Sequence, residues 1–366
     1  MSHIWRNTAL LCALMALFIL PCSAVDVTQA QWESLDTQSI EQAAAVSDAD
    51  LELNRDFTLQ EGLFRLGEQF PRKLREALSS ACRTGLVLLL AVLFSELSGT
   101  MGDLAGAGDR YSVLVGALTV TAISAADVNA LLGLGRTAVD DIWTFSTLLI
   151  PVMTALSAAS GSFTGATARQ VTTFVFADGL VTLLDKVYLP MVYLYVAACV
   201  AAAVTDNSGL CEVAKAIKWV ITGTLSALLL CFTGYLSLTS AAAAGADAVT
   251  VRLTRSVISS AVPVVGGILS NATDTILSGV GLLKGVVGTF GVVAVLGLGL
   301  TAFLRLGVQY LMYRLVSVLS QVLSGSRVAR LIGDIASAFA LVLAMTFTSA
   351  LLVLISIFAT LAVVIV

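Results

Sequence analysis

The chain has 366 residues, of which 58% are hydrophobic and 12% charged, and its formal net charge is -4. A soluble domain carries roughly a quarter charged residues, so this composition excludes an ordinary soluble protein and predicts an all-α, polytopic integral membrane protein. The small net charge argues against nucleic acid as a partner.

The predicted mature chain lacks the residues that several common chemistries need. The only histidine, His3, lies in the predicted leader, which excludes Ser-His and Cys-His nucleophiles and histidine metal ligands. The sequence contains no G-x-x-x-x-G-K-[ST] phosphate loop, so energy coupling would come from a partner ATPase or an ion gradient. We therefore expect no catalytic, cofactor-binding or metal site, and no enzymatic activity.

Residues 1–24 have the pattern of a secretory signal peptide. Arg6 is followed by an apolar run from Leu10 to Leu20, and the small residue Ala24 closes the pattern. We expect cleavage after Ala24, or a retained signal anchor if the leader stays attached. In either case the chain from residue 25 onward begins on the extracytoplasmic side.

Residues 25–80 form a predicted acidic, helical extracytoplasmic segment. They contain eleven acidic and five basic residues. Spacings of three and four predict an amphipathic helix whose apolar residues are Leu59, Leu63, Leu66, Phe70 and Leu74. Two interpretations remain open: a helix that docks on a partner or on the membrane surface, and a local helical cap with a solvated face.

Residues 81–366 form the predicted multi-spanning membrane domain. A helix needs about 20 apolar residues to cross the hydrocarbon core of a bilayer. The sequence predicts seven or eight spans, near 83–101, 111–130, 142–160, 187–205, 217–240, 286–303, 305–323 and 335–362. Two further apolar but interrupted segments, 168–185 and 258–284, are interpreted as short, amphipathic or re-entrant helices.

The basic residues give an incomplete orientation for these spans. Lys215 and Lys218 predict one cytoplasmic loop, and Arg327 and Arg330 predict another, because cytoplasmic loops are rich in lysine and arginine. The basic residues around 72–83 and 252–255 do not fit a simple alternation of loops. The sequence therefore leaves the orientation of the individual loops open.

The stretch 239–291 is the most distinctive part of the chain. It opens with small residues from Ser240 to Gly245, which permit close contact between helices. A helix over 246–260 is expected to be interrupted by proline and glycine before a second helix begins. The candidate polar core comprises Asp247, Arg252, Arg255, Pro263, Gly266, Gly267, Asp274 and Lys284.

Charges at membrane depth are costly, so the charged members of this core must pair, face a cavity or lie at the interface. One interpretation is the polar, broken-helix core of a channel or transporter. The other is snorkelling at the interface together with structural ion pairs. Asp178 and Asp185 form a weaker candidate, either as an ion relay or as a structural group beside Lys186.

The same stretch resembles the signature region of the stage III sporulation protein AE family of endospore-forming bacteria. The matching words are Ala246–Arg252, Val262–Gly267, Asp274–Thr275 and Leu282–Lys284 through Gly288 to Gly291. The wider order of leader, acidic helical segment and several spans also looks like that family. Only 239–291 carries a specific resemblance.

The resemblance implies a non-enzymatic, permease-like subunit of the channel complex that joins the mother cell to the forespore. Its implied location is the mother-cell membrane surrounding the forespore. Its implied partners are other stage III proteins of the same operon, including an ATPase subunit, a forespore protein across the intermembrane space, and the lipid membrane itself.

Two alternatives come from other classes of protein. A stand-alone secondary transporter would place its substrate site in 239–291, although no convincing internal repeat supports it. An intramembrane hydrolase would need a Ser-Lys pair, but Ser278 and Lys284 do not share a helix face.

Overall fold

The computed structural model describes residues 41, 44, 53, 57–104, 110–159, 163–205, 207–261, 266–323 and 326–362. Within these ranges, the side chains of 99–104, 110–112, 163–166, 169, 239–261, 266–280, 323, 326 and 362 are outside the description. The predicted signal peptide at 1–24 also lies outside the described residues, as does most of the segment from 25 to 56.

Every regular element in the described part of the chain is helical, which confirms the all-α prediction. The elements are α4 (Leu59–Leu104), α5 (Arg110–Ala159), α6 (Phe163–Leu183), the π-helical turn η1 (Leu184–Tyr188), α7 (Leu189–Thr205), α8 (Ser208–Ala261), α9 (Gly266–Leu323) and α10 (Ser326–Ala362). Because α6, η1 and α7 follow one another without a gap, they form one continuous helical rod.

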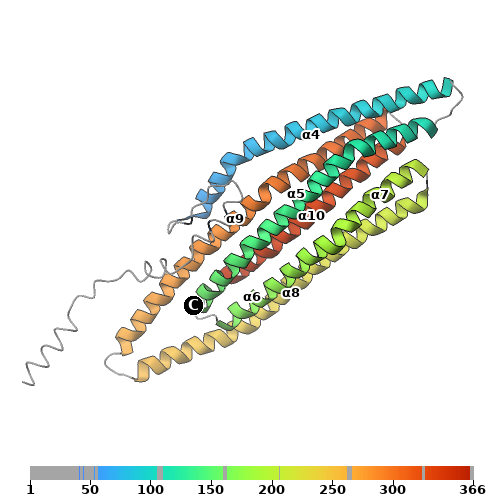
Figure 1. Cartoon of the computed structure of the whole chain (residues 1–366). Coiled ribbons are helices and arrows are strands. Elements are labelled where there is room, and N and C mark those ends of the chain that lie inside the picture. The colour runs from blue at the N-terminus through green and yellow to red at the C-terminus, as the bar shows by residue number, and fades with distance from the viewer. Residues whose placement is uncertain are drawn as a thin grey trace, which may run out of the picture.

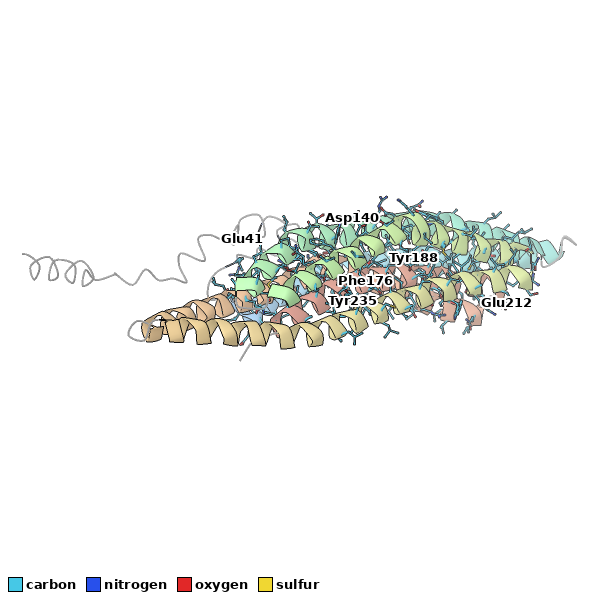
Figure 2. All side chains as sticks on the ribbon, turned by 90° about the horizontal axis from the view of Figure 1, so that it is seen from below. Glu41, Asp140, Phe176, Tyr188, Glu212 and Tyr235 are labelled. Carbon is cyan, nitrogen blue, oxygen red and sulfur yellow. The ribbon has the colours of Figure 1, made fainter. Side chains whose placement is uncertain are left out.

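The rods run up and down along an elongated bundle (Figure 1). The ends of α4, α7 and α9 and the starts of α5, α8 and α10 lie at one end of the bundle, and the start of α4 and the end of α10 lie towards the other. Helix α10 contacts α5, α6, α7, α8 and α9, so it forms the centre of the packing. Seen from below, Glu212 lies near the end with the α7–α8 turn, whereas Tyr188 of η1 lies near the middle (Figure 2).

Six described helical rods are long and apolar enough to cross a membrane, fewer than the predicted seven or eight. The predicted spans 111–130 and 142–160 both lie in α5, and 286–303 and 305–323 both lie in α9. In α5, Arg136, Asp140 and Asp141 lower the hydropathy between the paired spans but leave the backbone hydrogen bonds of the helix intact, whereas in α9 the paired spans are separated by Leu304 alone. Each of these two pairs of predicted spans therefore lies on one continuous helix with no turn between its members.

The rods are much longer than one bilayer crossing requires. With a rise of about 1.5 Å per residue, the 58 residues of α9 extend roughly 87 Å, against a hydrocarbon core of about 30 Å. Helix α4 likewise continues through residue 80, so the predicted amphipathic helix and the predicted span 83–101 are parts of one helix.

The outward faces of the bundle carry large apolar side chains. Phe94 on α4 is 71% exposed and Trp219 on α8 is 74% exposed. The inward face of α4 carries smaller residues, such as Ala77 and Ala81, which are buried against the bundle. Large apolar side chains on the outward faces favour a lipid environment, and small residues such as Ala77 and Ala81 let α4 approach the bundle closely.

The segment before α4 also contributes to the core. Leu53 and Phe57 are buried in one hydrophobic cluster with residues of α5, α9 and α10. The rings of Phe57 and Phe290 meet edge to face with centroids 5.4 Å apart. The described part of the predicted extracytoplasmic segment therefore packs on the bundle, while Leu59, Leu63 and Phe70 remain exposed.

Candidate functional site: polar groups inside the membrane bundle

The predicted polar core lies where α8 ends and α9 begins. Asp247, Arg252 and Arg255 are on α8, and Gly266, Gly267 and Asp274 are on α9. Helix α8 ends at Ala261 and α9 begins at Gly266, so the helix boundary falls where proline and glycine predict it. Pro263 lies outside the described residues, and the side chains of 239–280 are not described, so the predicted pairings stay predictions.

Lys284 is the one charged member of this core whose side chain is described. It is on α9 and only 5% exposed. One to two turns further along, a Cβ added to Gly288 would meet Leu361 of α10 at 2.6 Å, and one added to Gly291 would meet Leu149 of α5 at 2.5 Å. Gly288 and Gly291 thus let α9 come into close contact with α10 and α5 near Lys284.

Asp185 forms an ion pair with a residue of another helix, and the spacing of residues in the sequence did not indicate this pair. Its Oδ2 accepts a hydrogen bond from Nη2 of Arg136, on α5, at 3.0 Å. Its Oδ1 is buried and accepts no hydrogen bond from any residue that the structure describes. Asp178 is exposed on α6, and Lys186 is exposed beside Asp185.

This ion pair lies in the π-helical turn η1. Such turns are rare, insert one residue into a helix and occur frequently at functional sites. Here the turn joins α6 to α7 and places Tyr188 in the core, where its hydroxyl donates to Oγ1 of Thr224 on α8 at 3.0 Å. The turn therefore links the α5 contact of Asp185 with the α8 contact of Tyr188.

A second polar group lies between α4, α5 and α9, and sequence reasoning missed it. The carboxylate of Asp127 accepts a hydrogen bond from Nε2 of Gln309 and another from the hydroxyl of Tyr313, each at 2.9 Å. Glu76, Asp127 and Arg305 line an adjoining cavity of about 440 Å³. Charged residues inside an apolar span are the available sequence signal, and Asp127 lies within the predicted span 111–130.

Helix α4 adds a buried cation to the same side of the bundle. Lys73 is buried, and its Nζ donates a hydrogen bond to Oγ1 of Thr301 on α9 at 3.1 Å. Together with the Asp127 group, this contact shows that the α4–α9 interface contains ionisable side chains as well as apolar ones. Such groups can position helices, line a polar path or bind an ion.

Comparison with known proteins gives two matches. The sequence model of the family described as stage III sporulation protein AE matches residues 52–364. The stage III sporulation protein AE of Bacillus subtilis (strain 168) is 24% identical over 278 residues, which cover 75% of this chain and 68% of that protein. No solved structure matches the chain.

Proposed function

We propose that this chain, which belongs to the stage III sporulation protein AE family, is a non-enzymatic, multi-spanning subunit of the mother-cell-to-forespore channel complex of endospore formation. The observation that carries the proposal is the extent of the family match, which includes all six helical rods of membrane-crossing length. The membrane bundle as a whole is therefore what the chain has in common with a sporulation family.

The distribution of charge supports a location and an orientation. The α7–α8 and α9–α10 turns lie at one end of the bundle, beside Lys215, Lys218, Arg327 and Arg330. The positive-inside rule favours the cytoplasm for that end. In the mother-cell membrane around the forespore, the start of α4 then faces the intermembrane space.

This orientation gives each proposed partner a side of the membrane. A forespore protein would meet the N-terminal segment in the intermembrane space, because the segment packs on that part of the bundle. The ATPase subunit would act at the basic cytoplasmic end, and other stage III proteins would contact the lipid-facing helices. The channel complex itself, not this chain alone, would then supply the energy coupling.

The polar cavity between α4, α5 and α9 supports the second candidate, a stand-alone secondary transporter. Glu76, Asp127 and Arg305 offer ionisable groups in a cavity of about 440 Å³, within rods of membrane-crossing length. Ionisable groups in such positions mark substrate or ion pathways in transporters. A stand-alone transporter would work without the other stage III proteins, so co-isolation with them separates the two functions.

Substitutions in the predicted polar core test the proposed function in sporulating cells. Arg252→Ala and Asp274→Ala should each block spore formation after engulfment while the protein level in the membrane fraction stays near normal. The physical reason is that both residues are ionisable within a mostly apolar stretch of sequence, where charged groups are retained for a partner or a task. Heat-resistant spore yield, with an immunoblot of the membrane fraction, measures the effect.

Arg65→Ala is the matched control, because Arg65 forms an exposed pair with Glu61 on α4. It should leave spore yield unchanged. Arg252→Lys should fail like alanine if a partner engages the guanidinium through two hydrogen bonds, and should succeed if Arg252 only snorkels. Normal spore yield from both alanine variants would refute a functional polar core in this region.

A further inference from the structure

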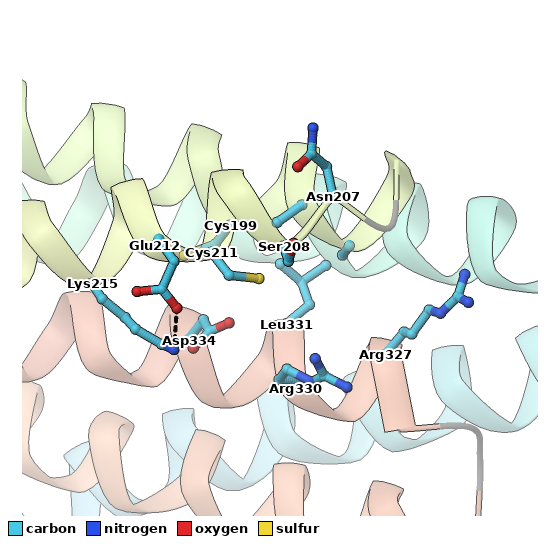
Figure 3. A pocket seen from close by; sticks show the side chains of 12 residues that line it. Cys199, Asn207, Ser208, Cys211, Glu212, Lys215, Arg327, Arg330, Leu331 and Asp334 are labelled. Carbon is cyan, nitrogen blue, oxygen red and sulfur yellow. Dashed lines mark hydrogen bonds and ion pairs between the residues drawn. The ribbon is translucent and has the colours of Figure 1, made fainter.

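A polar cavity lies between α7, α8 and α10, separate from the groups described above. It has a volume of about 250 Å³ and is enclosed by the last turns of α7, the α7–α8 turn and the first turns of α8 and α10. Its lining includes Asn207, Ser208, Lys215, Arg327, Arg330 and Asp334 (Figure 3). Two helices therefore begin at this cavity, and the partial positive charge of a helix lies at its beginning.

The cavity lies at the boundary between polar and apolar sequence. Directly beyond it, the chain carries no charged residue over 219–238 of α8, 335–361 of α10 and 187–205 of η1 and α7. Each of these runs is about long enough to cross the hydrocarbon core of a bilayer. The cavity is therefore at the level of the lipid headgroups, at the end that the basic turns assign to the cytoplasm.

Positive charge exceeds negative charge around the cavity. Of the residues that the structure describes, Lys215, Arg327 and Arg330 line it together with two acids, Glu212 and Asp334. Glu212 is engaged by Lys215, with Oε1 and Nζ 2.7 Å apart, as the dashed line in Figure 3 shows.

Asp334 is the half-buried centre of the basic cluster. Four cations act on its carboxylate: Lys215, Lys218, Arg314 and Arg330. Among the described residues at the cavity, these four cations and Arg327 therefore face two acids, Glu212 and Asp334. The excess charge and the arginine side chains suit a ligand with a negatively charged phosphate, which a guanidinium can bind through two hydrogen bonds.

We propose that this cavity binds the phosphate of an anionic phospholipid headgroup. Arg327 and Arg330 would contact the phosphate, and Asp334 would position the basic side chains without touching it. The apolar part of the lining, from Ala202, Ala203 and Leu331, would contact the glycerol end of the lipid. Basic pockets between membrane helices on the cytoplasmic side are a known type of lipid-headgroup site. The site is independent of the proposed channel role.

Thermal unfolding of the purified full chain in neutral detergent tests this site. Phosphatidylglycerol should raise the unfolding midpoint, whereas phosphatidylcholine should not. In Arg330→Gln the phosphatidylglycerol concentration for half-maximal stabilisation should rise roughly tenfold or more, because a charge-assisted hydrogen bond is lost. Lys186→Gln, at the far end of the charge-free run of α7, is the matched control and should respond like the unaltered chain.

A second variant keeps the test decisive if Arg330→Gln does not fold. Ala203→Leu fills part of the cavity without removing a charge, and it should also abolish the response to phosphatidylglycerol. Inorganic phosphate is a separate arm: equal stabilisation by phosphate alone would overturn the assignment to a lipid headgroup. An undiminished phosphatidylglycerol response in both Arg330→Gln and Ala203→Leu would overturn the site itself, as would an equal response to phosphatidylcholine.

Discussion

Replacing Gly135 with leucine is expected to destabilise the bundle by about 1–3 kcal/mol, the usual cost of overpacking a filled core. Gly135 is on α5 where it meets α10, and a Cβ at this position would overlap the Cγ1 methyl of Val342. Val342 is buried, and a valine side chain in a helix has a single strongly preferred rotamer, so it cannot easily move aside. The two helices would have to separate.

Gly133 provides a matched control two residues away on the same helix. A Cβ there meets nothing within 4 Å. Both substitutions gain the same helix propensity, about 0.8–1 kcal/mol relative to glycine. Gly133→Leu should therefore unfold at or above the original midpoint in detergent, and Gly135→Leu well below it, with partial recovery when Val342→Ala is added. Equal midpoints for the two leucine variants would show that the α5–α10 contact is not tight.

Arg136→Gln is expected to destabilise the protein by about 2 kcal/mol, somewhat less than the 2.5–3.5 kcal/mol of a charge at the centre of a bilayer. The substitution removes the partner of Asp185, which is 3.0 Å away. The side chain of Asp185 is only 29% exposed, and its second oxygen is already buried. A carboxylate left without its cation in that position loses the interaction that offsets its desolvation.

Removing both charges should restore part of the lost stability. Arg136→Gln with Asp185→Asn is expected to be more stable than Arg136→Gln alone, because no uncompensated charge remains. The exposed pair Lys215–Glu212, at 72% and 69% exposure, is the comparison, and its loss should cost at most about 1 kcal/mol. Thermal unfolding midpoints of the single and double variants measure both effects. If the double variant is no better than the single, the ion pair does not stabilise the bundle.

The sequence predicts the helices well because long apolar runs leave few other structures in a membrane. It divides the long helix α5 into two spans for a physical reason. At Arg136, Asp140 and Asp141 the hydropathy falls and suggests a loop, yet α5 continues, and Arg136 pairs with Asp185 on another rod. A charged gap between apolar runs can therefore be a loop or the middle of a continuous helix. Only the packing of distant helices distinguishes the two.

The candidate sites, like the helices, could be predicted from the sequence only in part. The resemblance in 239–291 identifies the family, and the helix boundary at 261–266 follows from local residues. The groups around Asp127 and Asp334 could not be assembled from spacing, because Tyr313 is 186 residues from Asp127 in the chain. Such groups depend on which helices become neighbours, and no local pattern carries that information.

Affinity isolation of the full chain from detergent-solubilised membranes of sporulating cells, followed by mass spectrometry, tests the proposed channel role most directly. The proposed role predicts that the other stage III proteins, including the ATPase subunit, are enriched with the chain but not with an unrelated multi-spanning protein carrying the same tag. Recovery of the folded chain alone, from cells in which the other stage III proteins are present and associated with one another, would contradict it.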